Sequence, residues 1–170
     1  MFARGFKSWC ETVAAQRRRD LGLHPTDRLD PGLLAGSLGV RVRSIDEVPN
    51  LDRESQTVLS SDSGGWSAVT ITDGIKHVVV LNSSHSTGRS SSDLMHELGH
   101  IILGHKPGRV DITEDGRLVL NTYDKAQEEE ATWLAGCLLL PREALLWVVH
   151  QRLSLVAGPE KYGVSIQMLE

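Results

Sequence analysis

Apolar and polar residues alternate along three segments of the chain, and this period of two predicts β-strands. The first segment covers residues 40–45, and the other two, 66–72 and 77–81, flank the turn-forming pair at residues 73–74. A second hairpin is predicted over residues 109–124, where the same alternation flanks an Asp-Gly pair. The first three segments are therefore predicted to form a small three-stranded sheet, which we expect to be mostly antiparallel.

Apolar residues recur at helical spacing between and after these strands. The predicted helices cover residues 7–21, 31–39, 90–105, 125–140 and 141–153. Together with the sheet they predict an α+β fold, in which the sheet packs on the helices over residues 90–105 and 125–140. We expect one domain over residues 1–153 and the start of an incomplete helical tail, similar to a helix-turn-helix, over residues 154–170.

The composition is that of an ordinary globular protein, with 40% hydrophobic and 24% charged residues. The formal net charge of −4 gives no reason to expect DNA as a partner, so the basic run at residues 17–19 is predicted to be a solvated helix face. Two distant cysteines, Cys10 and Cys137, predict reduced thiols and a cytoplasmic protein. No segment predicts a membrane span, and the pattern does not determine the oligomeric state.

Residues 96–100 read His-Glu-Leu-Gly-His and match the H-E-x-x-H zinc signature. Side chains four residues apart on a helix point within about 40° of each other, so His96 and His100 can bind one ion. Glu97 lies about 100° around the helix from His96, away from the apolar face. An amphipathic helix with surface histidines is the alternative, but such a helix has no need of Glu97.

A catalytic zinc ion needs a third protein ligand and an open position for water. His105 falls about 180° around the helix from His96, away from the metal, so we do not expect it to be a ligand. We expect it to interact with the last carbonyl groups of its helix. On the next predicted helix, Glu130 falls among apolar residues, whereas Glu128 and Glu129 do not. A carboxylate among apolar groups is costly unless it is paired, so Glu130 is predicted as the third ligand. A buried pair of Glu130 with an arginine is the alternative.

Three further residues are candidates for supporting roles. Asp93 lies near the metal-facing arc of the helix, where it can orient an imidazole or interact with the helix N-terminus. Tyr123 and His85 are candidate hydrogen-bond donors to the oxyanion that forms during peptide hydrolysis. Both can also be ordinary residues of surface loops.

Three segments together, residues 77–89, 93–105 and 128–141, resemble the ImmA/IrrE family of zinc metallopeptidases. The resemblance implies a zincin-like core of the gluzincin type with one Zn²⁺ per chain. It also implies that Glu130, which directly precedes Ala131, is the third zinc ligand.

The resemblance implies a substrate as well, because members of the family cleave helix-turn-helix repressors or antitoxins and so release phage, mobile-element or stress regulons. We therefore expect a zinc metalloendopeptidase with Glu97 as its general base. The alternative is a zinc-stabilised module that binds a repressor or another partner without cutting it. Direct DNA binding through residues 162–170 is disfavoured by the acidic balance of the chain.

Overall fold

The computed structural model describes residues 2–49, 52–61, 66–105, 110–112, 118–120, 124–154, 156–165 and 168. The helices in these ranges are α1 (Phe6–Asp20), α2 (Pro31–Ser37), the 3₁₀-helix η1 (Ile45–Glu47), α3 (Arg53–Ser61), α4 (Thr87–Leu103), α5 (Lys125–Leu139), α6 (Arg142–His150) and α7 (Ala157–Tyr162). The strands are β1 (Arg41–Ser44), β2 (Ala68–Asp73), β3 (Lys76–Leu81), β4 (Val110–Ile112) and β5 (Leu118–Leu120). These elements confirm the predicted α+β class.

Strands β1, β2 and β3 form one sheet in the order β1-β3-β2. The predicted hairpin is confirmed, with β2 antiparallel to β3 and Thr70 opposite Val79. The sheet is mixed, however, because β1 runs parallel to β3 and pairs Val42 with Val79. The sequence between β1 and β3 contains η1, α3 and β2, and a connection of this length allows two strands of one sheet to run parallel.

The second predicted hairpin is also present, since β4 pairs antiparallel with β5 and Val110 lies opposite Leu120. Its turn lies outside the described residues. The helix α3, in contrast, was not predicted. Only Val58 and Leu59 of its nine residues are apolar, too few to set a helical period in the sequence, and none of the nine is buried in the structure.

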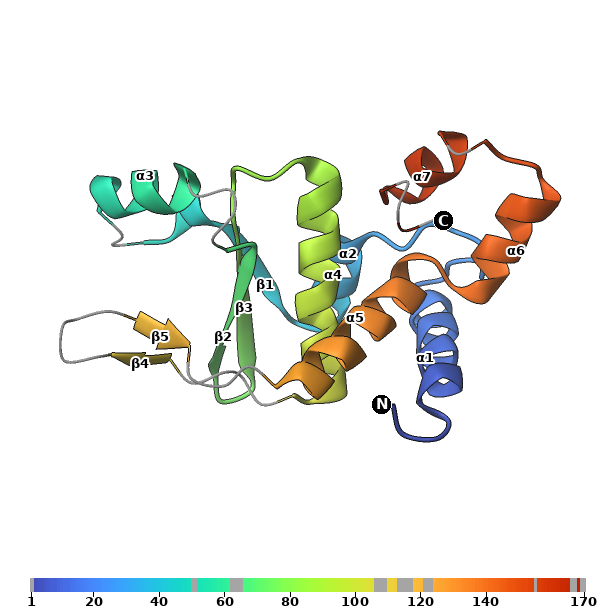
Figure 1. Ribbon diagram of the computed structural model, residues 1–170, viewed down its shortest axis with the longest axis horizontal. Helices are drawn as coiled ribbons and strands as arrows, with labels where there is room; N and C mark the ends of the chain where they lie inside the picture. The colour runs from blue at the N-terminus through green and yellow to red at the C-terminus, as the bar shows by residue number, and fades with distance from the viewer. Residues whose placement is uncertain are drawn as a thin grey trace.

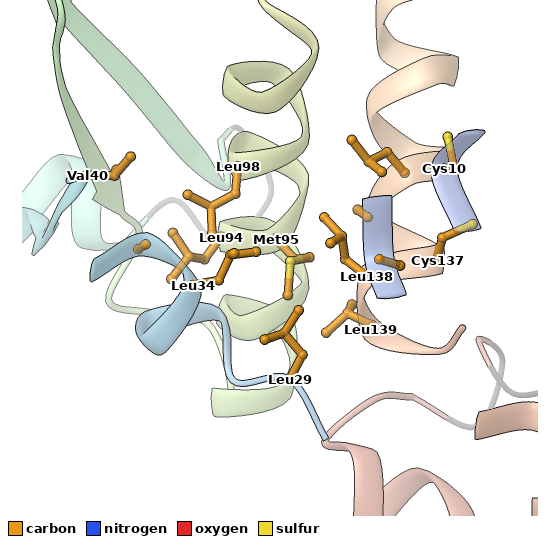
Figure 2. Packing of buried hydrophobic residues seen from close by; sticks show 14 of the residues in the cluster. Cys10, Leu29, Leu34, Val40, Leu94, Met95, Leu98, Cys137, Leu138 and Leu139 are labelled. Carbon is orange, nitrogen blue, oxygen red and sulfur yellow. The ribbon is translucent and has the colours of Figure 1, made fainter. Parts of the chain in front are cut away.

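The main hydrophobic core lies between the sheet and four helices, α1, α2, α4 and α5. Figure 1 shows α4 alongside the sheet, with α5 crossing α4 and α1 packed on α5. Leu94, Met95 and Leu98 of α4 are buried, as the helical wheel predicted, and Figure 2 shows Met95 between α4 and the α5 residues Leu138 and Leu139. Each fully buried side chain of this size stabilises the fold by roughly 1.5–3 kcal/mol.

A buried arginine joins α1 to the end of α5. Arg18 is 0% exposed, and its guanidinium donates hydrogen bonds to the carbonyl oxygens of Leu138 at 2.8 Å, Ala14 at 3.3 Å and Asp27 at 3.1 Å. The basic run at residues 17–19 is therefore not a uniformly solvated face. Positive charge is favourable there because the C-terminal carbonyls of a helix carry partial negative charge.

The described part of the C-terminal segment packs against the rest of the chain. Tyr162 of α7 is 1% exposed, lies in a second apolar cluster with Leu140 and Val148, and donates a hydrogen bond to the carbonyl of Thr26 at 2.8 Å. The domain boundary after residue 153 stays a prediction.

Length and apolar character decide which of the described helices could span a membrane. None of them alone combines the length and apolar character of a span, whereas α5 and α6 together, with a bend of 46° between them, meet those two measures.

Candidate metal centre

Helix α4 carries the histidine pair. It begins earlier than predicted, because the hydroxyl of Ser86 accepts a hydrogen bond from the amide of Arg89 and caps the free end. His96 and His100 lie one turn apart, and their Nε2 atoms are 3.1 Å from each other. Both imidazoles therefore point their Nε2 atoms at the same place, as the H-E-x-x-H spacing predicted.

A carboxylate from α5 completes this group. Glu128 lies with one oxygen, Oε2, 3.1 Å from Nε2 of His96 and the other, Oε1, 3.4 Å from Nε2 of His100. Among the described residues, His96, His100 and Glu128 form a group whose potential ligand atoms all lie within 4.8 Å of one another. Ligands about 2.0–2.1 Å from a tetrahedral zinc ion are about 3.3 Å apart. The donor types and spacings therefore fit a zinc ion.

The predicted ligand Glu130 lies elsewhere. Its Oε2 is 3.3 Å from Nε2 of His105, and the position expected for Glu130 beside the histidine pair is taken by Glu128. Helix α5 packs against α4 and α1, and the helical wheel did not distinguish these two sides. Glu128 lies on the same side of α5 as Ala131, which contacts α4. Glu130 lies on the same side of α5 as Cys137, and the Sγ of Cys137 lies 3.6 Å from a carboxylate oxygen of Glu11 on α1. The spacing Glu128-x-x-Ala131 is the sequence feature that places Glu128 on the α4 side of α5.

Helices α4 and α5 lie close together at Gly99, inside the H-E-x-x-H motif. A Cβ atom at this position would lie 2.9 Å from the backbone oxygen of Ala131, which is closer than real contacts of this kind. The absence of a side chain therefore allows the two helices to approach each other. Glu128 lies one turn before Ala131, so this close approach brings its carboxylate to the histidines.

We predict that Gly99→Ala destabilises the fold by about 1–3 kcal/mol, because the added methyl group forces α4 and α5 apart. Zinc affinity is expected to fall with it, since Glu128 moves away from the histidines. Thermal denaturation and a zinc competition assay measure both effects. Gly136→Ala on α5 is the matched control, since its Cβ would meet no atom within 4 Å, and it is expected to be neutral or stabilising by about 0.5–1 kcal/mol.

Glu97 lies beside the histidines and next to the sheet. Its Oε2 accepts a short hydrogen bond from the hydroxyl of Thr70 on β2. Burial raises the pKa of Glu97, an effect that the Thr70 hydrogen bond and the nearby His96 oppose. A carboxyl group with a raised pKa accepts and returns a proton more readily at neutral pH, as a general base must. The predicted role of Glu97 fits this environment, and Thr70 is a contact that the sequence analysis did not identify.

A cavity of about 320 Å³ opens beside these groups and is lined by Ser67, Ala68, Asp93, His96 and Glu97. Asp93 pairs there with an imidazole other than those of His96 and His100. Its Oδ2 lies 2.7 Å from Nδ1 of His85, whose side chain is only 1% exposed. The imidazole that Asp93 orients is therefore that of His85, and the burial of His85 favours such a supporting role over contact with substrate. The other candidate donor, Tyr123, lies outside the described residues.

The Nδ1 atoms of both metal-facing histidines have partners of their own. Nδ1 of His96 lies 3.3 Å from the hydroxyl of Thr132, and Nδ1 of His100 lies 2.9 Å from Nδ1 of His105. Burial lowers the pKa of His100, which favours the neutral imidazole that metal binding requires. The side chain of His105 thus contacts a neighbouring imidazole, where the sequence analysis expected a helix-end carbonyl.

The mixed α+β fold, the histidine pair on one helix and the glutamate on the next define a zincin-like metallopeptidase core. The family model named Peptidase_M78, described as the IrrE N-terminal-like domain, matches residues 35–170. The chain therefore belongs to this metallopeptidase family, and the resemblance to ImmA/IrrE proteins is confirmed. A search of curated protein sequences finds no match.

Proposed function

We propose that the protein is a zinc-dependent metalloendopeptidase. The observation that carries the proposal is the convergence of His96, His100 and Glu128 on one point, with Glu97 beside them at the wall of the same cavity. Two imidazoles and one carboxylate are a ligand set that catalytic zinc sites use with a fourth position open. A zinc-stabilised binding module needs the three ligands but has no use for Glu97.

Bound zinc would supply Lewis acidity and a water of lowered pKa. Glu97 accepts a proton from the attacking water as its oxygen bonds to the peptide carbon. It then delivers that proton to the amide nitrogen as the carbon–nitrogen bond breaks, so that the products are a carboxyl group and an amine. The hydroxyl of Thr70 holds the Glu97 carboxylate in place through this exchange.

Strand β2 offers a way to bind the polypeptide substrate. Within the part of the chain that the structure describes, β2 pairs with β3 and with no other strand. Ser67 and Ala68, at the start of β2, line the cavity beside His96 and Glu97. An extended peptide that adds to the free edge of β2 would lie along this cavity, with backbone hydrogen bonds holding it.

The proposed substrate is a helix-turn-helix repressor or antitoxin, as the ImmA/IrrE resemblance suggests. Such a substrate acts in the cytoplasm, where the free thiols of Cys10 and Cys137 also persist. Unrestricted proteolysis would be harmful there, so we expect cleavage at one or a few sites of one regulator.

The test is incubation of the zinc-loaded protein with purified helix-turn-helix regulators of the same genome, with casein as a generic substrate and mass spectrometry as the readout. We expect defined fragments from one regulator and little digestion of casein. Rapid, chelator-sensitive digestion of casein would contradict the narrow specificity. Stable binding of a regulator without cleavage would favour the alternative, a zinc-stabilised regulatory module.

A further inference from the structure

A row of polar side chains runs from the metal centre toward the end of α4. His100 is followed by His105, with their Nδ1 atoms 2.9 Å apart, and His105 is followed by Glu130, with Nε2 and Oε2 3.3 Å apart. The side chain of His105 is 9% exposed and that of Glu130 is 29% exposed, so water competes little for the first of these contacts. Neither residue belongs to the group of three potential ligands.

The backbone at the end of α4 explains how His105 reaches this position. Gly104 has a φ of 66°, a left-handed conformation that ends the helix and that side chains disfavour. The amide of His105 then donates a hydrogen bond to the carbonyl of His100 at 3.0 Å, so the chain folds back over the last turn. This places the two imidazoles edge to face, with their ring centroids 5.0 Å apart.

Metal binding fixes where each proton of this row must lie. His100 faces Glu128 with Nε2, so Nε2 is its ligand atom and its one ring proton is on Nδ1. That Nδ1–H points at Nδ1 of His105, which must therefore accept. A neutral His105 then carries its own proton on Nε2, the atom that faces the carboxylate of Glu130. The distances thus give every donor in the row one acceptor.

We propose that His105 and Glu130 are positioning residues that hold His100 in its metal-binding orientation. The proposal rests on the metal centre proposed above and adds an outer pair of residues to it. Hydrogen bonding to the free nitrogen of a ligating histidine fixes its tautomer and ring orientation and increases its basicity. In this row Glu130 acts through His105, and His105 acts through His100.

The first test compares two variants of His105 by zinc competition with a chromophoric chelator. His105→Leu removes the acceptor and is expected to weaken zinc binding about 10–100-fold. His105→Asn keeps an oxygen near the position of Nδ1 and is expected to restore most of the affinity. The visible spectrum of the Co²⁺-substituted protein should change in the leucine variant and return toward wild type in the asparagine variant.

A double-mutant cycle tests whether Glu130 acts on zinc binding through His105. Glu130→Ala is expected to weaken zinc binding less than His105→Leu does, and to have no further effect in the His105→Leu background. Melting temperatures without metal should agree among the folded variants, which separates positioning from a general loss of stability. If the leucine variant does not fold, the same cycle with His105→Asn applies, in which Glu130→Ala should again add nothing.

Two results would overturn the proposal. One is unchanged zinc affinity and cobalt spectrum in His105→Leu, which would leave the metal centre of His96, His100 and Glu128 as proposed. The other is a loss of affinity in Glu130→Ala that is larger than that of His105→Leu and persists in both backgrounds, which would make Glu130 a direct ligand and revise the metal centre as well. Failure of the wild-type protein to bind zinc would overturn this proposal and the proposed function together.

Discussion

Glu97→Gln is expected to lower the rate of peptide hydrolysis by about 10²–10⁴-fold while one zinc ion per chain is retained. Glutamine has the shape of glutamate and can still contact Thr70, but it cannot accept a proton from water. The variant therefore removes the proton transfer and leaves the proposed ligands His96, His100 and Glu128 in place. The measurement is kcat/KM on the cleaved regulator, with zinc content determined on the same preparation.

Glu129→Gln is the matched control, because Glu129 is exposed on α5 and its nearest charged partner is Lys125 at 3.9 Å. It should keep both activity and zinc. Full activity in Glu97→Gln would show that another group accepts the proton, whereas joint loss of activity and zinc would show that Glu97 also maintains the metal site.

Glu128→Ala is expected to abolish stable zinc binding, with an effect well beyond the about 10–100-fold loss typical of residues that only support a ligand. The reason is that the two histidines alone leave zinc with half of a tetrahedral shell. Elemental analysis after gel filtration should find close to one zinc in the wild-type protein and almost none in the variant.

Glu130→Ala and Glu129→Ala serve as comparisons on the same helix. Both should keep zinc at the concentrations of an elemental analysis, since neither carboxylate meets the histidine pair in the structure. If Glu130→Ala loses zinc as completely as Glu128→Ala does, Glu130 is a zinc ligand, as predicted from the sequence. If Glu128→Ala retains zinc, Glu128 is not a ligand.

The sequence was sufficient for those features that depend on local periodicity. The histidine pair, the apolar face of α4 and the β2–β3 hairpin follow from spacings of four, three to four and two residues, and each is present in the structure. Similarly, the second hairpin follows from alternation on both sides of an Asp-Gly pair. Features of this kind can be predicted without knowing which other helix or strand packs against them.

Deciding which carboxylate lies beside the histidine pair requires that knowledge, which a helical wheel lacks. A wheel shows that a face of α5 is buried but does not show whether α4 or α1 covers it, and it selects Glu130 from the combined face. The burial of Arg18 is hidden from the sequence for a similar reason, because one of its carbonyl partners, Leu138, lies 120 residues away. The parallel pairing of β1 likewise depends on a distant strand.

The contact between Arg18 and the carbonyl of Leu138 bears on where the minimal protein begins. The family match starts at residue 35, yet α1 precedes it and holds the end of the helix that carries Glu128. A fragment cut at residue 35 would keep His96, His100 and Glu128 and lose the side of the core against which α5 rests. For expression or domain transplantation, the unit to preserve is therefore the pair α4 and α5 together with the N-terminal helix behind it.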